Sequence, residues 1–258
     1  MAAALLDHHA VTWIMRHFQS GPRVGGVTGN PRIRNRTTLL GKIQVGEFSS
    51  IIGLIKRAQR TYGRLFTVSG VLCAFRVSAL RQVGFWSNDM LTEDIDISWK
   101  LENNHWDLRF EPRALVWILM PETFKGLYKQ RLRWAMGGTQ VLQKYAGILR
   151  QWRKRRMWPI YIEFIMSVAW AYTMLVIFIL WGLGFFLPLP QEMRVAAVIP
   201  AWSGVVIGFT CLLQFSVSAG LDSRYDPKMW RSTYWMIWYP LVYWLINVAS
   251  TVVAVPRV

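Results

Sequence analysis

The chain has 258 residues, 53% of them hydrophobic, and a formal net charge of +16. Residues 1–158 hold 25 of the 30 lysines and arginines and 10 of the 14 acidic residues, so the charge lies almost wholly in this part. Two cysteines do not make the disulfide framework of a small secreted domain, and the four histidines lack metal-ligand spacing. Composition therefore predicts a basic, water-soluble part followed by an apolar part.

The basic part also has a nucleic-acid interpretation. Its cations cluster beside the apolar part, at Arg150–Arg156, or among turn residues, at Asn30–Arg36. No zinc-finger spacing, recognition-helix pattern or aromatic platform accompanies them. Anionic lipid headgroups and a nucleotide diphosphate explain the charge more economically, and we expect no nucleic-acid partner.

The first 157 residues alternate between helical and extended patterns. Apolar spacing predicts helices over residues 5–18, 39–62 and 93–103, and strands over residues 24–27, 66–75 and 114–119. This alternation predicts an α/β domain.

Three uncharged runs follow, over residues 164–191, 195–221 and 232–256. Each exceeds the roughly 20 apolar residues that a helix needs to cross a bilayer, and three in succession are hard to explain as buried helices of a soluble protein. The five cations within Arg150–Arg156 favour a cytoplasmic location for the basic part. We therefore expect helices that cross out, in and out, with the C-terminus near the far face.

Thr92-Glu93-Asp94 begins the predicted helix over residues 93–103. Thr92 is a plausible N-cap, and carboxylates in a first helical turn interact well with the helix dipole, so the tripeptide has a purely structural interpretation. A carboxylate at such a loop-to-helix junction can also project into a cleft as a general base.

Gln130, Arg133 and Trp134 have the spacing of one helical face, with Arg131 turned partly aside. Two guanidiniums and an amide can hold a diphosphate through charge-assisted hydrogen bonds, and the ring of Trp134 can support a sugar. The alternative is a membrane-surface helix whose arginines meet lipid headgroups.

Ser69-Gly70 lies within the predicted strand over residues 66–75. A glycine there permits close approach of a substrate to the backbone, although it more often marks a bulge.

Together these residues resemble the processive family-2 glycosyltransferases, which include the cellulose, chitin and hyaluronan synthases, and among them the bacterial poly-β-1,6-N-acetylglucosamine synthases. The pairing of Thr-Glu-Asp with Gln-x-x-Arg-Trp ahead of membrane spans is the specific part of the resemblance. The motifs are Val27–Arg34, Val45–Phe48, Val68–Gly70, Met90–Asp96 and Lys129–Trp134.

The resemblance implies an α/β GT-A-like partial domain over residues 1–157, followed by a transmembrane α-helical region over residues 158–258 with about three spans. It implies inverting transfer from UDP-N-acetylglucosamine to a growing β-1,6-linked exopolysaccharide of biofilm matrix, with coupled export at the bacterial plasma membrane. Asp94 is then the general base. Gln130, Arg131 and Arg133 hold the donor diphosphate, while Trp134, Ser69, Gly70 and Glu93 contact the acceptor.

The family also implies Mg2+ as a cofactor and a small membrane accessory subunit as a partner. Its metal-binding Asp-x-Asp motif stands immediately before Ala4-Leu5-Leu6-Asp7, but Met1 and Ala3 occupy the acidic positions here. We therefore expect no metal ligands in this chain, which resembles the C-terminal portion of the family. A cellulose-, chitin- or hyaluronan-type synthase remains an alternative, as does a non-catalytic membrane scaffold.

Overall fold

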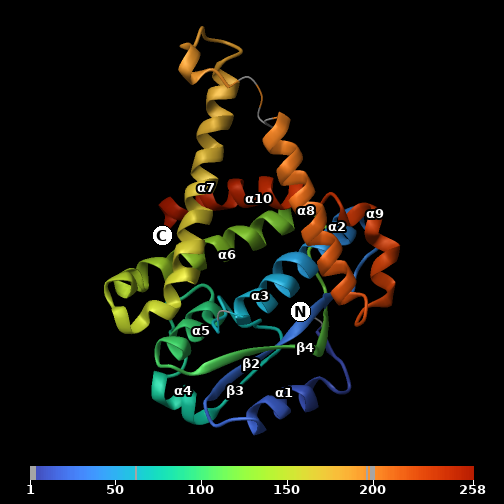
Figure 1. The fold of residues 1–258 in the computed structure, drawn as a ribbon, viewed down its shortest axis with the longest axis vertical. Coiled ribbons are helices and arrows are strands. Elements are labelled where there is room, and N and C mark those ends of the chain that lie inside the picture. The colour runs from blue at the N-terminus through green and yellow to red at the C-terminus, as the bar shows by residue number, and fades with distance from the viewer. Residues whose placement is uncertain (1–3, 62, 196, 198–200) are drawn as a thin grey trace.

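The structure is a computed structural model that describes residues 4–61, 63–195, 197 and 201–258. An α/β part carries a helical part from which two long helices extend (Figure 1). The elements are β1 Leu5–Leu6, α1 Ala10–Gln19, β2 Val24–Ile33, α2 Leu39–Glu47, η1 Phe48–Leu54, α3 Ile55–Thr61, β3 Cys73–Phe75, α4 Val77–Val83, α5 Glu93–Asn103, β4 Asp107–Ile118, α6 Phe124–Lys144, η2 Ala146–Arg150, η3 Trp152–Met157, α7 Trp158–Leu183, η4 Gln191–Met193, α8 Ala201–Asp222, η5 Pro227–Ser232, α9 Thr233–Met236, α10 Tyr239–Ala254 and η6 Val255–Arg257.

The four strands form one mixed sheet in the order β1-β4-β2-β3. The central strands β2 and β4 are parallel, whereas β1 and β3 pair antiparallel with their neighbours. All ten residues of β2 are buried, as is typical of a strand covered on both faces. Figure 1 shows α1 below the sheet and α3 and α5 above it.

The first predicted helix and strand differ in extent from the structure. Residues 5–6 pair with β4 as an edge strand, so α1 begins only at Ala10. β2 continues to Ile33 through Asn30-Pro31-Arg32, which we interpreted as turn residues. The register of β2 against β4 shifts between Thr28 and Asn30. Pro31 therefore follows an irregularity in the ladder, where its missing N–H is tolerated.

The helix predicted over residues 39–62 has an irregular centre. α2, η1 and α3 follow one another without a break as far as Thr61, and the central element, η1, is a π-helix. Tyr62 lies outside the described residues. Ser49 and Ser50 of η1 are buried against α8, where their hydroxyls bond to the carbonyl oxygen of Ser218 at 3.2 Å and to its hydroxyl at 2.9 Å. The wider π-helical turns thus lie where the α/β part makes polar contacts with α8.

The strand predicted over residues 66–75 is confirmed only at β3. The amides of Phe66, Val68 and Ser69 donate instead to side chains, so the segment before β3 is a loop held by side-chain acceptors. The strand predicted over residues 114–119 is the end of the longer β4, and the helix over residues 93–103 is confirmed as α5. The α/β class is therefore confirmed.

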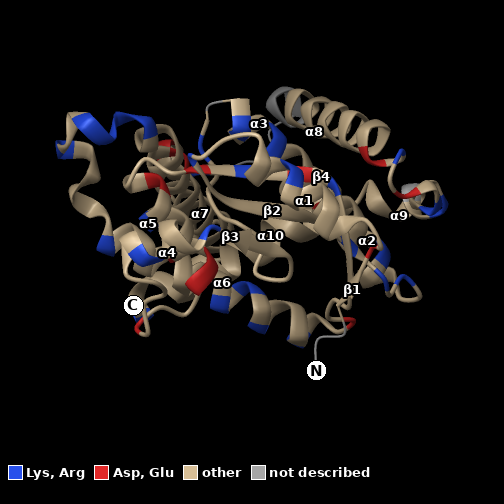
Figure 2. Ribbon diagram, turned by 90° about the horizontal axis from the view of Figure 1, so that it is seen from below, with Lys and Arg blue, Asp and Glu red and all other residues tan. Residues whose placement is uncertain are grey.

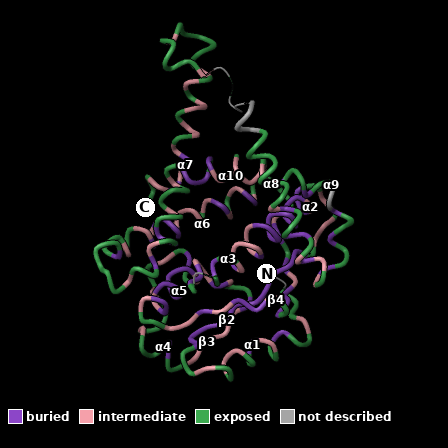
Figure 3. The backbone as a smooth tube through the Cα atoms, in the orientation of Figure 1, coloured by how far each residue is buried: buried purple, intermediate pink, exposed green. Residues whose placement is uncertain are grey.

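Three helices are long and apolar enough to cross a membrane, within residues 152–183, 205–222 and 234–257. α7 and α8 extend away from the sheet, and much of their surface is exposed (Figure 3). α10 instead lies across α7 and beside α6, and the C-terminus lies near the α/β part rather than at the far ends of α7 and α8 (Figure 1). The chain end thus packs beside α6 in the structure, and the side of the membrane on which it lies stays a prediction.

A buried ion-pair network joins the end of α8 to the α/β part. Asp222 accepts from Arg32 at 2.6 Å, from Arg57 at 2.9 Å and from the Ser49 hydroxyl at 2.6 Å. Arg36 pairs in the same way with Asp226. Arg32 and Arg36 belong to the cluster that we assigned to turn residues, and their charge is matched by carboxylates distant in sequence rather than by lipid or nucleic acid.

Candidate active site

The Thr92-Glu93-Asp94 segment begins α5, as predicted from its sequence. Thr92 occupies the N-cap position, but its side chain makes no capping hydrogen bond and is 4% exposed. The Asp94 carboxylate accepts from the amide of Ile95 at 3.0 Å. The buried threonine therefore anchors the segment by packing rather than by capping.

Gly70 lies against this carboxylate. A Cβ added at Gly70 would lie 3.4 Å from Oδ2 of Asp94, and the Gly70 amide lowers the pKa of this carboxylate. Ser69 is held from the sheet, because its amide donates to Thr28 Oγ1 at 2.7 Å. Ser69-Gly70 is thus a loop seated beside Asp94, and its glycine permits this close approach.

Two charged side chains, the buried Lys56 and the exposed Glu93, act on Asp94. Burial raises the pKa of Asp94, the neighbouring Glu93 raises it further, and Lys56 on α3 lowers it. Burial lowers the pKa of Lys56 to about 8, against the opposing effect of Asp94. Burial also raises the pKa of Cys73 to about 11, so this thiol stays protonated at neutral pH. Asp94 is therefore a carboxylate of increased basicity with one cation close by.

α6 carries the Gln130–Trp134 motif and packs directly on the Thr92 segment. A Cβ added at Gly137 would lie 2.1 Å from Thr92 Oγ1, so glycine is required for this contact. The amide of Leu91 donates to Gln140 Oε1 at 2.9 Å. Gly137 is one helical turn after Arg133, a rise of about 6 Å. The acidic segment at the start of α5 thus contacts the turn of α6 that follows the arginine motif.

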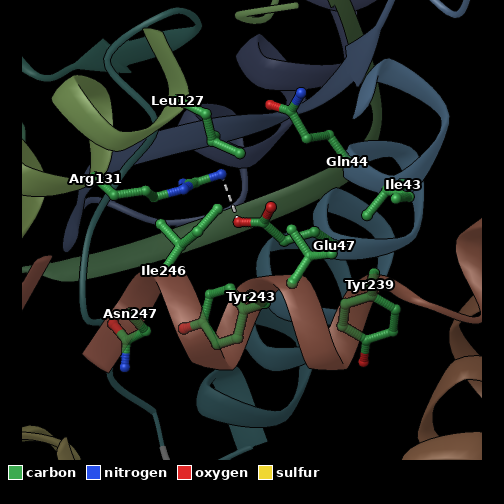
Figure 4. A pocket seen from close by; sticks show the side chains of 10 residues that line it. Ile43, Gln44, Glu47, Leu127, Arg131, Tyr239, Tyr243, Ile246 and Asn247 are labelled. Atoms are coloured by element: carbon green, nitrogen blue, oxygen red, sulfur yellow. Dashed lines mark ion pairs between the residues drawn. The ribbon is translucent and has the colours of Figure 1, made fainter. Parts of the chain in front are cut away.

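Arg131 is held by a carboxylate of α2. Its Nη2 lies 2.5 Å from Oε1 of Glu47, and the two side chains point toward each other above α10 (Figure 4). Arg131 and Glu47 are only 8% and 5% exposed. Burial raises the pKa of Glu47, and the Arg131 guanidinium opposes the rise. A space of about 20 Å³ beside the pair is lined by Tyr243 and other side chains, enough for a single water.

The remaining motif residues differ in accessibility. Arg133 is exposed, whereas Trp134 is partly buried against the core and carries the Arg131 guanidinium 4.3 Å from its ring centroid. Gln130 is half-buried, and its Oε1 lacks a hydrogen-bond partner among the described residues. Arg133 is therefore the motif cation that is open to a ligand.

The described residues offer no group of three histidine, cysteine or acidic side chains that could hold a metal ion. Positions 1 and 3, where the acidic pair of the expected motif would stand, lie outside the described residues. Within the part of the chain that the structure describes, the side chains thus do not fit a divalent cation, and no chemical step is assigned to one.

Two residues important to this geometry escaped sequence analysis. Lys56 and Glu47 both lie in the helical run over residues 39–61 and are buried, although charged. Glu47 falls within the Val45–Phe48 motif, but nothing local identifies Arg131 as its partner. Lys56 is followed by Arg57 and Arg60 in the same helix, and nothing in the sequence marks Lys56 as the buried cation.

Comparison with known proteins identifies the family to which the chain belongs. A model described as glycosyl transferase family group 2 matches residues 3–247. The chain therefore belongs to this family. As a member of glycosyl transferase family group 2, it combines the α/β fold with three apolar helices, which suggest membrane association.

Two curated relatives within the family are named poly-beta-1,6-N-acetyl-D-glucosamine synthase. The protein of Staphylococcus epidermidis is 40% identical over 99% of this chain, and that of Staphylococcus aureus strain COL is 41% identical over 99%. The chain spans 62% of the length of each. A solved structure, the mannosyltransferase PcManGT from Pyrobaculum calidifontis in complex with GDP-Man and Mn2+, is 15% identical with a TM-score of 0.49, over 96% of this chain and 59% of that one.

Proposed function

We propose that this chain carries the acceptor-activating and diphosphate-binding groups of a polymerising, inverting N-acetylglucosaminyltransferase. The donor would be UDP-N-acetylglucosamine and the product a β-1,6-linked exopolysaccharide. Two observations carry the proposal, in a chain 40% identical to a synthase of this name: Gly70 lies against Asp94, and the Thr92 segment packs on α6 one turn after its Gln130–Trp134 motif.

Asp94 is assigned the role of general base. It would take the proton of the acceptor hydroxyl while that oxygen bonds to the anomeric carbon and the bond to UDP breaks, which inverts the configuration. Burial raises the pKa of Asp94, so its carboxylate is a stronger base than an exposed aspartate. Glu93, Ser69, Gly70 and the uncovered part of Trp134 would contact the acceptor.

Gln130 and Arg133 are assigned to the donor diphosphate, where they would stabilise the charge that develops as UDP leaves. Arg131 would assist diphosphate binding indirectly, because it positions Trp134. Glu47 and the ring of Trp134 hold its guanidinium, and Arg131 in turn fixes Trp134. Mg2+ remains a proposed cofactor of the full-length enzyme. The described residues of this chain offer no group of side chains that could bind it.

We place the enzyme at the bacterial plasma membrane, with residues 1–157 as the cytoplasmic part and residues 158–258 as the membrane part. α7 and α8 would cross the bilayer, because their connecting loop at 184–195 carries few cations. α10 would lie at the inner face beside α6. A small membrane subunit remains the proposed partner for export of the polymer.

Lys56 offers a test of the assigned base. Replacing Lys56 with methionine removes a cation that lowers the pKa of Asp94. The base would then be protonated up to a higher pH, so we expect the acid limb of the pH–rate profile to move to higher pH. Above pH 8 the two profiles should converge, because Lys56 itself loses its charge near pH 8. Lys56→Arg should keep the original limb, and an unchanged limb in Lys56→Met would contradict the assignment.

The function itself is tested in a hybrid with the length of the relatives. Its N-terminal part is the segment of the Staphylococcus epidermidis synthase that this chain does not match, and the remainder is this chain. Membranes containing it should transfer label from UDP-N-acetylglucosamine to a polymer that a hexosaminidase specific for β-1,6 linkages degrades. A labelled polymer that resists the hexosaminidase would indicate a cellulose-, chitin- or hyaluronan-type synthase. No transfer would favour a non-catalytic scaffold.

A further inference from the structure

A second polar pocket lies at the other end of α5. Its volume is about 300 Å³, and it lies between the α5–β4 turn and η3, the basic segment ahead of α7. Figure 2 shows the blue bands of this segment beside α5. The six cations that line the pocket are Arg23, Arg64, Arg153, Lys154, Arg155 and Arg156.

These cations are not neutralised within the structure. Among the ion pairs of the described residues, none involves any of the six. Arg23 and Arg64 donate only to carbonyl oxygens, of His105 and Gly63 respectively. Six cations around one cavity repel each other and concentrate a positive potential there, which favours an anionic ligand.

Buried polar atoms on the pocket wall also lack partners. Arg64 is 6% exposed and its Nε has no hydrogen-bond acceptor, while Glu102 is 1% exposed and its Oε2 has no partner. Both side-chain polar atoms of Asn103 are likewise unpartnered. Buried polar groups are almost always hydrogen-bonded in folded proteins. Several buried polar atoms without partners on one cavity wall therefore indicate that a polar ligand binds there.

Glu102 is compatible with an anion because it is largely protonated. Burial raises the pKa of Glu102 to about 8, against the lowering effects of the Leu65 amide and the Arg64 charge. The Leu65 amide donates to Oε1 at 2.7 Å, which leaves Oε2 as the oxygen able to carry the proton. At neutral pH the side chain can therefore donate a hydrogen bond to an oxygen of the ligand.

We propose that this pocket binds a phosphate-bearing anion, held by Arg64 and Glu102 in its interior and by Arg153–Arg156 at its rim. Glu102 is eight residues after Asp94 on α5, about 12 Å along the helix axis, so the pocket is separate from the transfer site. Since α7 begins at Trp158, directly after the rim, the phosphate can belong to an anionic lipid headgroup or to a soluble phosphate.

Binding is tested with the full chain in lipid nanodiscs, in an Arg133→Gln background that weakens the proposed donor site. Inorganic diphosphate is titrated by calorimetry into discs of phosphatidylcholine alone and into discs containing phosphatidylglycerol. The double variant Arg153→Gln/Arg156→Gln removes two exposed rim cations. Arg81→Gln/Lys125→Gln removes two exposed cations elsewhere and serves as the matched control.

We expect the rim variant to weaken diphosphate binding at least tenfold in phosphatidylcholine discs, and the control variant to change it less than twofold. Competition by phosphatidylglycerol would identify a lipid headgroup as the occupant, and its absence would identify a soluble phosphate. Glu102→Gln, which keeps a neutral donor, should bind as the unmodified pocket does. Equal losses in the rim and control variants, or no binding in either disc, would overturn the proposal.

Discussion

Replacing Asp94 with asparagine in the hybrid enzyme is expected to lower the transfer rate by about 10²–10⁴-fold, the usual contribution of a general base. The substitution keeps the size of the side chain, so its contacts with the Ile95 amide and Gly70 persist. Only the ability to accept a proton is lost. The rate is measured as label transferred per unit of hybrid protein, quantified in the membrane.

Asp89→Asn is the matched control for this prediction. Asp89 is an exposed carboxylate five residues before Asp94, and the same substitution there should change the rate less than twofold. The unmodified enzyme should gain activity as the pH rises through the raised pKa of Asp94, because the base must be ionised. An Asp94→Asn enzyme that keeps a tenth or more of the rate would mean that another group removes the proton.

Asp222→Ala is expected to destabilise the chain by about 3–5 kcal/mol, the usual cost of removing one partner of a buried ion pair. Asp222 is fully buried and accepts from Arg32 and Arg57, so alanine removes the carboxylate of Arg57 and leaves Arg32 with Asp226 at 4.0 Å only. Because the ion-pair network joins α8 to the α/β part, the Asp222→Ala variant should unfold at a lower denaturant concentration than the unmodified chain. Unfolding by sodium dodecyl sulfate in mixed micelles measures the change.

The control for this variant is Glu192→Ala, which removes an exposed carboxylate from the loop between α7 and α8. It should leave the unfolding midpoint unchanged. Replacing the pair together, as Arg32→Met with Asp222→Leu, should recover part of the lost stability, since apolar side chains need no counter-charge. A change below about 1 kcal/mol in Asp222→Ala would show that the network does not hold the parts together.

The helical positions of the two motifs were predictable because each motif is local. Thr92-Glu93-Asp94 lies at a helix start, and the i, i+3 spacing of Gln130 and Arg133 defines a helical face whatever surrounds it. The partner of Arg131 was not predictable, because Glu47 is 84 residues away and the pairing depends on how α2 and α6 both pack on α10. The family resemblance assigned Arg131 to the donor diphosphate, whereas in the structure its guanidinium pairs with a buried carboxylate.

The extents of strands and the direction of α10 depend on tertiary contacts. β2 runs through Pro31 because a ladder irregularity accommodates it, which no turn signal in the sequence indicates. α10 is apolar enough to span a bilayer, but one of its faces packs on α6 and α7, while Leu241 and Leu245 stay about half exposed. Hydrophobicity alone measures the preference for leaving water and does not specify whether lipid or protein receives the helix.

The central claim is that Asp94 activates the acceptor while the α6 motif holds the donor, and UDP affinity separates these two roles most directly. The measurement is the dissociation constant of UDP for the purified hybrid, for its Asp94→Asn variant and for its Arg133→Gln variant. We predict that Asp94→Asn, although inactive in transfer, binds UDP within twofold of the unmodified hybrid, and that Arg133→Gln binds at least tenfold more weakly. Weakened binding in Asp94→Asn together with unchanged binding in Arg133→Gln would contradict the account.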